Sequence, residues 1–104
     1  MTAEAVAALV DDSIGGRWSE TNLHGVSLRE RLLRRPERIE AVTVDGEENA
    51  SLWLVLTECG IGENGYGIAF SEADGAFGLV QFTADYEPCL IGIYGTFWEA
   101  FQAM

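Results

Sequence analysis

Hydrophobic residues at helical spacing predict a short helix near the start of the chain, over residues 2–10. Thr2 can cap this helix, and the charge of Glu4 suits the positive end of the helix dipole. The pair Gly15-Gly16 prevents any continuation. The predicted buried stripe consists of Val6, Leu9 and Val10. In the irregular segment that follows, the residues expected to contact the core are Trp18 and Leu23.

A second helix is predicted from Ser27, because Ser27 and Glu30 have the spacing of a capping box. The serine oxygen then accepts from the Glu30 amide, while the glutamate side chain reaches back to the Ser27 amide. Pro36 disfavours a helical conformation at Arg35, so the helix is expected to end there. Its predicted buried stripe consists of Leu28, Leu32 and Leu33.

Hydrophobic runs after residue 38 predict an antiparallel sheet. The run 52–58 is apolar on both faces, which is typical of a central strand that is covered on both sides. Thr96 and Glu99 repeat the capping-box spacing and predict a final short helix to Met104. The strands are expected at 39–44, 52–58, 66–71, 76–82 and 88–94.

The third and fourth strands are expected to form a hairpin whose register follows from its turn, residues 72–75. With these residues as the loop, bulky side chains meet on one face of the sheet and small ones on the other. The bulky face pairs Tyr66 with Gln81, Ile68 with Leu79 and Phe70 with Phe77. The smooth face pairs Gly67 with Val80, Ala69 with Gly78 and Ser71 with Ala76.

Together these elements predict a single α+β domain over residues 1–104. The N-terminal helices are expected to pack on the bulky face of an antiparallel meander of about five strands, followed by a short C-terminal helix. The chain has 104 residues and is 48% hydrophobic, which suffices for one packed core and leaves no room for a second. No repeat or linker indicates another domain.

Charge is the unusual property of the composition, because the formal net charge is −11 and every base is an arginine. Five arginines lie in residues 27–40, whereas residues 41–104 hold ten acids and no base. Nucleic acid and anionic membranes repel such a chain, so neither is expected as a ligand. Without an apolar run of membrane-spanning length or a secretory signal, a cytoplasmic location is expected, with Cys59 and Cys89 as reduced thiols.

The sequence shows no motif for catalysis, cofactor binding or metal binding, and none of these is expected. His24 could activate Cys59 beside Glu58, but no local motif surrounds them, and a polar histidine in a turn is favoured. The glycine-rich residues 60–65 precede a strand and lack a lysine, which favours a hairpin connection over a phosphate loop. The acids at 45–48 lack the alternating ligands of a calcium loop.

The leading hypothesis is a small interaction module that binds a basic protein partner. Such a module could act as an inhibitor of that partner. An acidic surface accelerates encounter with a cationic protein and rejects acidic ones. In size and charge the chain is similar to bacterial toxin-immunity proteins, a compositional resemblance that covers no motif and implies a partner such as a basic nuclease. The acids expected at loop tips are Glu47, Glu48, Glu63, Glu72, Asp74, Asp85 and Glu87, with Trp98 as the aromatic anchor.

Two alternatives use other residues. The arginines between Arg29 and Arg38 could hold a small anionic ligand between the helices and the sheet, through bidentate contacts, in a binding protein or a minor enzyme. The candidate ligand residues are Arg34, Arg35 and His24. Alternatively, the smooth sheet face, with or without Trp98, could pair two copies of the chain as a homodimer.

Overall fold

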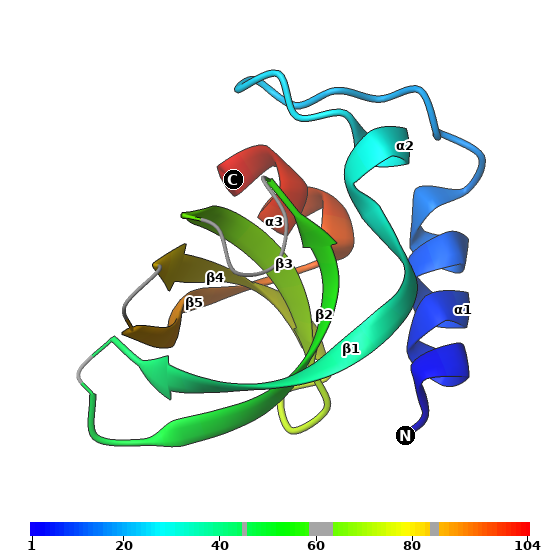
Figure 1. The fold of residues 1–104 in the computed structure, drawn as a ribbon. Helices are drawn as coiled ribbons and strands as arrows, with labels where there is room; N and C mark the ends of the chain where they lie inside the picture. Colours follow the sequence, from blue (N-terminus) through cyan, green and yellow to red (C-terminus); the bar gives the residue numbers. More distant parts are fainter. Residues whose placement is uncertain (45, 59–63, 84–85) are drawn as a thin grey trace.

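A computed structural model describes all residues except 45, 59–63 and 84–85. It confirms the α+β class, with two helices before a five-stranded sheet and one after it (Figure 1). The helices are α1 (Ala3–Ile14), α2 (Leu28–Arg31) and α3 (Phe97–Ala103). The strands are β1 (Leu32–Thr43), β2 (Asn49–Thr57), β3 (Gly65–Ser71), β4 (Ala76–Thr83) and β5 (Tyr86–Gly95).

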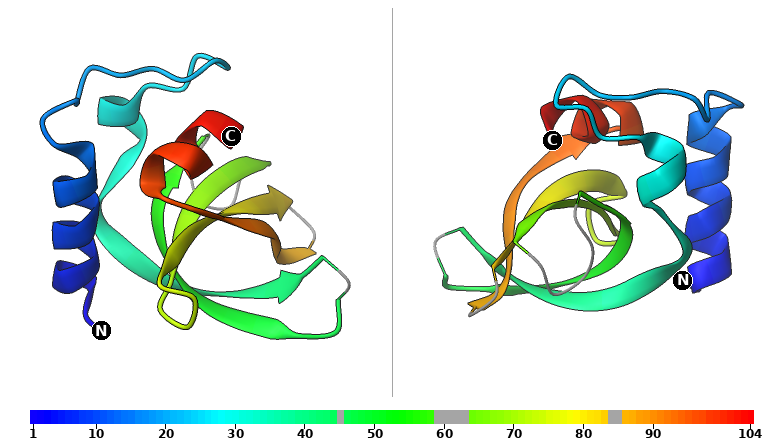
Figure 2. Two further views of the ribbon diagram at one scale, coloured as in Figure 1. Left: turned by 180° about the vertical axis from the view of Figure 1, so that it is seen from behind. Right: turned by 45° about the horizontal axis from the view of Figure 1, so that its top comes forward.

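The five strands form a meander that closes into a barrel in the order β1-β2-β3-β4-β5 (Figure 2). Consecutive strands are antiparallel, and β1 closes against β5 in parallel at two pairs, Val42 with Cys89 and Thr43 with Leu90. The parallel closure follows from the odd number of strands, because alternating directions leave the first and fifth strands pointing the same way. The meander was expected, but the closure was not.

The β3–β4 hairpin has the predicted register at every pair. Tyr66 lies opposite Gln81, Ile68 opposite Leu79 and Phe70 opposite Phe77, and the three smooth-face pairs agree as well. The turn closes through the Gly75 amide, which donates to the Ser71 carbonyl at 2.8 Å. At φ +62°, Gly75 adopts the left-handed conformation that glycine tolerates best.

The first helix begins as predicted but is longer. Thr2 accepts a hydrogen bond from the Ala5 amide, and the helix runs to Ile14 before Gly15 ends it with φ +57°. Leu9 is 37% exposed, so its place in the buried stripe was wrong. The stripe continues instead at i, i+3, i+7 and i+11 through Ala3, Val6, Val10 and Ile14. After the helix, Trp18 packs against the core as expected, whereas Leu23 is 86% exposed and does not.

The second helix is a single turn, which corrects its predicted end at Arg35. Ser27 accepts from the Glu30 amide, but α2 ends at Arg31 and Leu32 begins β1. Leu32 and Leu33 then pack into two different hydrophobic clusters, as alternating strand residues do. Pro36 lies where the pairing with β2 is interrupted between Leu32 and Glu37, so its missing N–H breaks no regular ladder.

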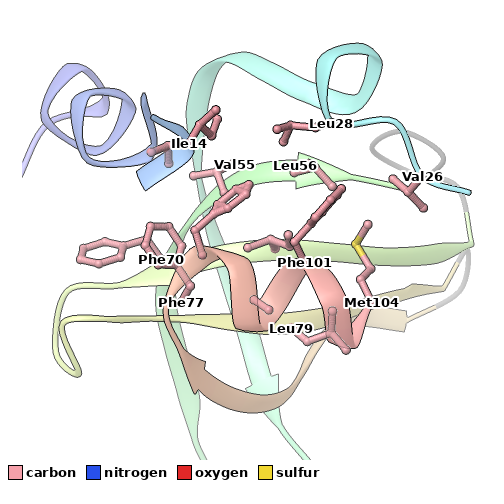
Figure 3. Close-up of a cluster of buried hydrophobic side chains, with 14 of the residues drawn as sticks. Ile14, Val26, Leu28, Val55, Leu56, Phe70, Phe77, Leu79, Phe101 and Met104 are labelled. Atoms are coloured by element: carbon pink, nitrogen blue, oxygen red, sulfur yellow. The ribbon is translucent and has the colours of Figure 1, made fainter. Parts of the chain in front are cut away.

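The larger hydrophobic cluster lies between the helices and the bulky face of the sheet (Figure 3). An aromatic series crosses it, from Phe70 to Phe77 at 5.0 Å between ring centroids and from Phe77 to Phe97 at 5.7 Å. The C-terminal helix α3 therefore covers β3 and β4, whereas α1 lies against β1, β2 and α3. Residues of α1 and α2 belong to the same cluster as the bulky face, as expected, and α3 shares that face with them.

The β2 strand is covered on both sides as predicted, but its alternation is interrupted. The pairing of β2 with β3 shifts between Leu54 and Leu56, which is the signature of a bulge at Val55. As a result Val55 and Leu56 both join the larger cluster, while Leu52 and Leu54 join the second one.

The second hydrophobic cluster draws on all five strands and therefore fills the inside of the barrel. The smooth face lies here, with Ala69 1% exposed and Val80 fully buried. A Cβ atom on Gly78 would lie 2.6 Å from the Gly92 carbonyl oxygen, so only glycine fits. The proposed homodimer surface on this face is wrong, because the face packs inside the protein.

Candidate functional site

Three of the predicted partner-binding acids line one groove. Glu48 comes from the turn between β1 and β2, and Glu72 and Asp74 come from the turn between β3 and β4. The groove has a volume of about 660 Å³, and Ala50 and Leu90 are among its apolar residues. We call it the acidic groove.

Glu72 is the electrostatic centre of the acidic groove. One oxygen of its carboxylate accepts the indole N–H of Trp53 at 2.7 Å and lies 3.4 Å from the Arg38 guanidinium. The Met1 amino group lies 3.5 Å from the same oxygen. The hydrogen bond from Trp53, together with the charges of the amino group and Arg38, holds the pKa of Glu72 below its usual value.

Asp74 organises the turn rather than projecting freely from it. Its carboxylate accepts the Ser71 hydroxyl at 2.8 Å, and its own amide donates to the same hydroxyl oxygen at 3.3 Å. Ser71 is buried, so this pair of bonds fixes the conformation of residues 71–75. The turn therefore presents Glu72 and Asp74 in a defined position.

The remaining predicted acids are only partly brought together. Glu47 and Glu87 are exposed, and neither is among the described residues that line the acidic groove. Val44, in the same turn as Glu48, is 67% exposed. The predicted sites Glu63 and Asp85 lie outside the described residues.

Trp98 does not line the acidic groove, because internal contacts hold it elsewhere. Its indole N–H donates to the Ser13 carbonyl at 2.8 Å, and its ring contacts Phe97 and Phe101 edge-on. The Arg17 guanidinium lies 4.1 Å from the ring centroid. Trp98 thus joins α3 to the end of α1.

The alternative ligand residues lie in three separate hollows. Arg34 lines a cleft between α1 and the start of β1, whereas Arg35 pairs with Glu4 at 2.7 Å and faces a second cleft. His24 lines a third cleft beside Glu58 and Tyr66. The structure therefore does not assemble Arg34, Arg35 and His24 into one site.

Arg34 instead shares its cleft with Arg29, in a hollow of about 370 Å³ that we call the arginine cleft. Neither guanidinium forms an ion pair or a hydrogen bond with the residues that the structure describes. Arg17, Arg35 and Arg38 each have a carboxylate partner. Arg29 and Arg34 are both exposed, and both line this cleft.

The third cleft contains His24 and Glu58, two of the residues that could form a nucleophile site with Cys59. Its volume is about 400 Å³, and its walls include Leu79 and Ile91. His24 Nδ1 contacts the Met104 carbonyl, and Glu58 accepts the Tyr66 amide at 3.2 Å. Cys59 and most of the glycine-rich loop 60–65 lie outside the described residues, so the proposed pairing of His24 with Cys59 is not tested.

Asn22 was missed by sequence reasoning, although it is among the few buried polar residues. Its amide nitrogen donates to the carbonyls of Phe101 and Met104, at 3.0 and 3.2 Å. Its oxygen accepts the amides of His24 and Val26, both at 3.0 Å. Asn22 thereby joins the segment before α2 to the end of α3, a long-range role that no local pattern indicates.

Within the described residues, no three His, Cys, Asp or Glu side chains are grouped so that they could hold a metal ion. None of the helices described is both long and apolar enough to cross a membrane. Comparisons with protein-family models, with curated proteins and with solved structures find no match for the chain.

Proposed function

We propose that the protein is an interaction module that binds a basic protein partner at the acidic groove. The observation that carries the proposal is the convergence of Glu48, Glu72 and Asp74 on one groove from two separate turns. A groove of about 660 Å³ can admit a lysine or arginine side chain of the partner.

The charge balance at the groove favours a cation. Among the described residues that line the groove, Arg38 is the only basic side chain, and it already contacts Glu72 at 3.4 Å. Glu72 attracts Arg38 and the Met1 amino group from distant parts of the chain, which illustrates how a partner's cation can bind. The net charge of −11 adds long-range attraction that speeds the encounter.

Apolar surface beside the acids supports a protein partner rather than a free cation. Ala50 and Leu90 line the groove, and Val44 is 67% exposed on the neighbouring turn. Interfaces combine such apolar contacts with a charged rim, and the charges there set the rate and specificity of association.

The test compares two double variants with equal changes of charge. Glu48→Gln with Glu72→Gln removes two groove charges while leaving an oxygen to accept the Trp53 N–H. Asp12→Asn with Glu30→Gln removes two exposed charges that line none of the three clefts or the groove. A partner is first captured at low salt from the source cells, then purified, and its Kd is measured by calorimetry over a range of ionic strength.

The groove variant is expected to weaken binding at least about tenfold, or about 1.4 kcal/mol, and the control variant less than about threefold. The wild-type affinity is expected to fall as salt rises. Equal losses in both variants, an affinity that does not change with salt, or the absence of any basic protein at low salt would each contradict the proposal.

A further inference from the structure

We infer that the arginine cleft binds a small monocarboxylate with an apolar body, a ligand site separate from the acidic groove. The cleft is lined by residues of α1, α2, β1 and β2, and Figure 2 shows α2 and the start of β1 beside α1. The lining residues that matter here are Val10, Asp11, Trp18, Arg29, Arg34 and Val55.

The two arginines supply the recognition of an anion. Arg29 comes from α2, and Arg34 follows on β1 in the interval where regular pairing with β2 is interrupted. Neither has a partner among the described residues, so binding a carboxylate breaks no existing ion pair. A guanidinium matches a carboxylate in a bidentate geometry, which lysine cannot reproduce.

The floor of the cleft is apolar and rigid. Val10 is 3% exposed and Val55 1% exposed, and both belong to the larger hydrophobic cluster. Trp18 is partly buried and provides an aromatic wall. With a volume of about 370 Å³, the cleft falls in the range of small-molecule sites, which join an apolar lining to a few polar groups.

Asp11 restricts the charge of the ligand. It is an exposed acid on α1 and lines the same cleft as Arg29 and Arg34. A carboxylate here repels a second negative charge on a ligand, so a monoanion is favoured over a dianion such as a phosphate monoester. The ligand class is therefore a single carboxylate attached to a neutral apolar group.

In the experiment, 3-phenylpropionate is titrated into the isotope-labelled protein, and binding is measured from the shifts of the protein's NMR signals. The neutral amide of 3-phenylpropionate tests the need for charge, and acetate tests the need for an apolar body. Arg29→Gln and Arg34→Gln each remove one guanidinium from the cleft. Arg31→Gln is the matched control, because Arg31 is exposed, has no ion pair among the described residues and does not line the cleft.

3-Phenylpropionate is expected to bind saturably and to shift the signals of Ala7, Val10 and the Trp18 indole. Arg29→Gln and Arg34→Gln are each expected to lower the affinity for 3-phenylpropionate at least about fivefold, and Arg31→Gln less than about twofold. Asp11→Asn is expected to raise the affinity for 3-phenylpropionate, because it removes a negative charge from the cleft. Equal loss in Arg31→Gln, equal binding of the amide, or no saturation by about 20 mM would overturn the inference. The acids of the groove are intact in all these variants, so this result does not depend on the proposed partner.

Discussion

The two faces of the sheet are packed by opposite means. The outer face carries large aromatic side chains, and Phe97 and Phe101 of α3 are fully buried against it. The inner face combines small residues such as Gly67, Ala69 and Gly78 on β3 and β4 with large side chains from the same and neighbouring strands, such as Leu54 and Phe82. The outer layer is built from large side chains, whereas the inner layer has no room for a side chain at Gly67 or Gly78.

This difference predicts opposite sensitivities. Removing volume from the outer layer leaves a cavity, whereas adding volume to the inner layer forces backbone apart. The closed barrel connects the two, since β3 and β4 contribute to both layers. The acidic groove and the clefts lie on this frame, so their geometry depends on both kinds of packing.

The largest effect is expected from truncating the outer layer at Phe97. Phe97→Ala removes a fully buried ring that contacts Phe77, Trp98 and Phe101 at centroid distances of 5.7, 5.6 and 6.0 Å. The cavity is expected to lower the free energy of unfolding by about 3–5 kcal/mol, measured by urea denaturation. Phe97→Leu keeps most of the volume and should lose less; an equal loss in both would show that volume does not decide stability here.

The inner layer is expected to reject even one methyl group at Gly78. In Gly78→Ala the new Cβ would lie 2.6 Å from the Gly92 carbonyl oxygen and 3.0 Å from Ile93 Cδ1, so backbone has to move. We expect a loss of about 1–3 kcal/mol by urea denaturation. Gly92→Ala is the matched control, because its Cβ meets only Tyr94 Cε2 at 3.8 Å. Similar losses at both glycines would contradict the tight approach of β4 to β5.

The local parts of the fold could be predicted from the sequence. The β3–β4 register follows from a four-residue turn and the match of bulky and small positions, all within residues 66–82. The capping box at Thr96 and Glu99 was equally local and is confirmed in α3. Both features depend on residues that are close together in the chain, so the local sequence pattern is enough to predict them.

The parts that depend on distant contacts could not be predicted. Helical spacing of Leu28, Leu32 and Leu33 favours a helix, but the pairing of Leu32 with Leu56 places the last two in β1. The closure of the barrel by β1 and β5 also turned the smooth face inward. Among the predicted site residues, three acids meet in one groove. The predicted ligand residues lie apart, because Arg35 pairs with Glu4 and His24 contacts the Met104 carbonyl.

Asn22 offers a way to loosen the outer layer without touching its aromatic rings. In Asn22→Ala the amides of His24 and Val26 and the carbonyls of Phe101 and Met104 lose their partner. We expect a loss of about 1–2 kcal/mol and faster hydrogen exchange at the end of α3. The control is Asn49→Ala, at an exposed position. Unchanged exchange in α3 would show that the contact does not hold the helix end.

The smallest effect is expected from Glu72, which lies on the turn between β3 and β4. The hydrogen bond from Trp53, aided by the charges of the Met1 amino group and Arg38, lowers the pKa of Glu72 below its ordinary value of 4.5. A carboxyl group with a lowered pKa in the folded state stabilises the protein fully above the unfolded-state value. That contribution is lost as pH falls through the lowered pKa. The stability advantage of the wild type over Glu72→Gln, measured by thermal unfolding, should therefore be largest near neutral pH and shrink on acidification. The same difference at pH 7 and pH 3 would show that the Trp53 and Arg38 contacts do not favour the ionised carboxylate in solution.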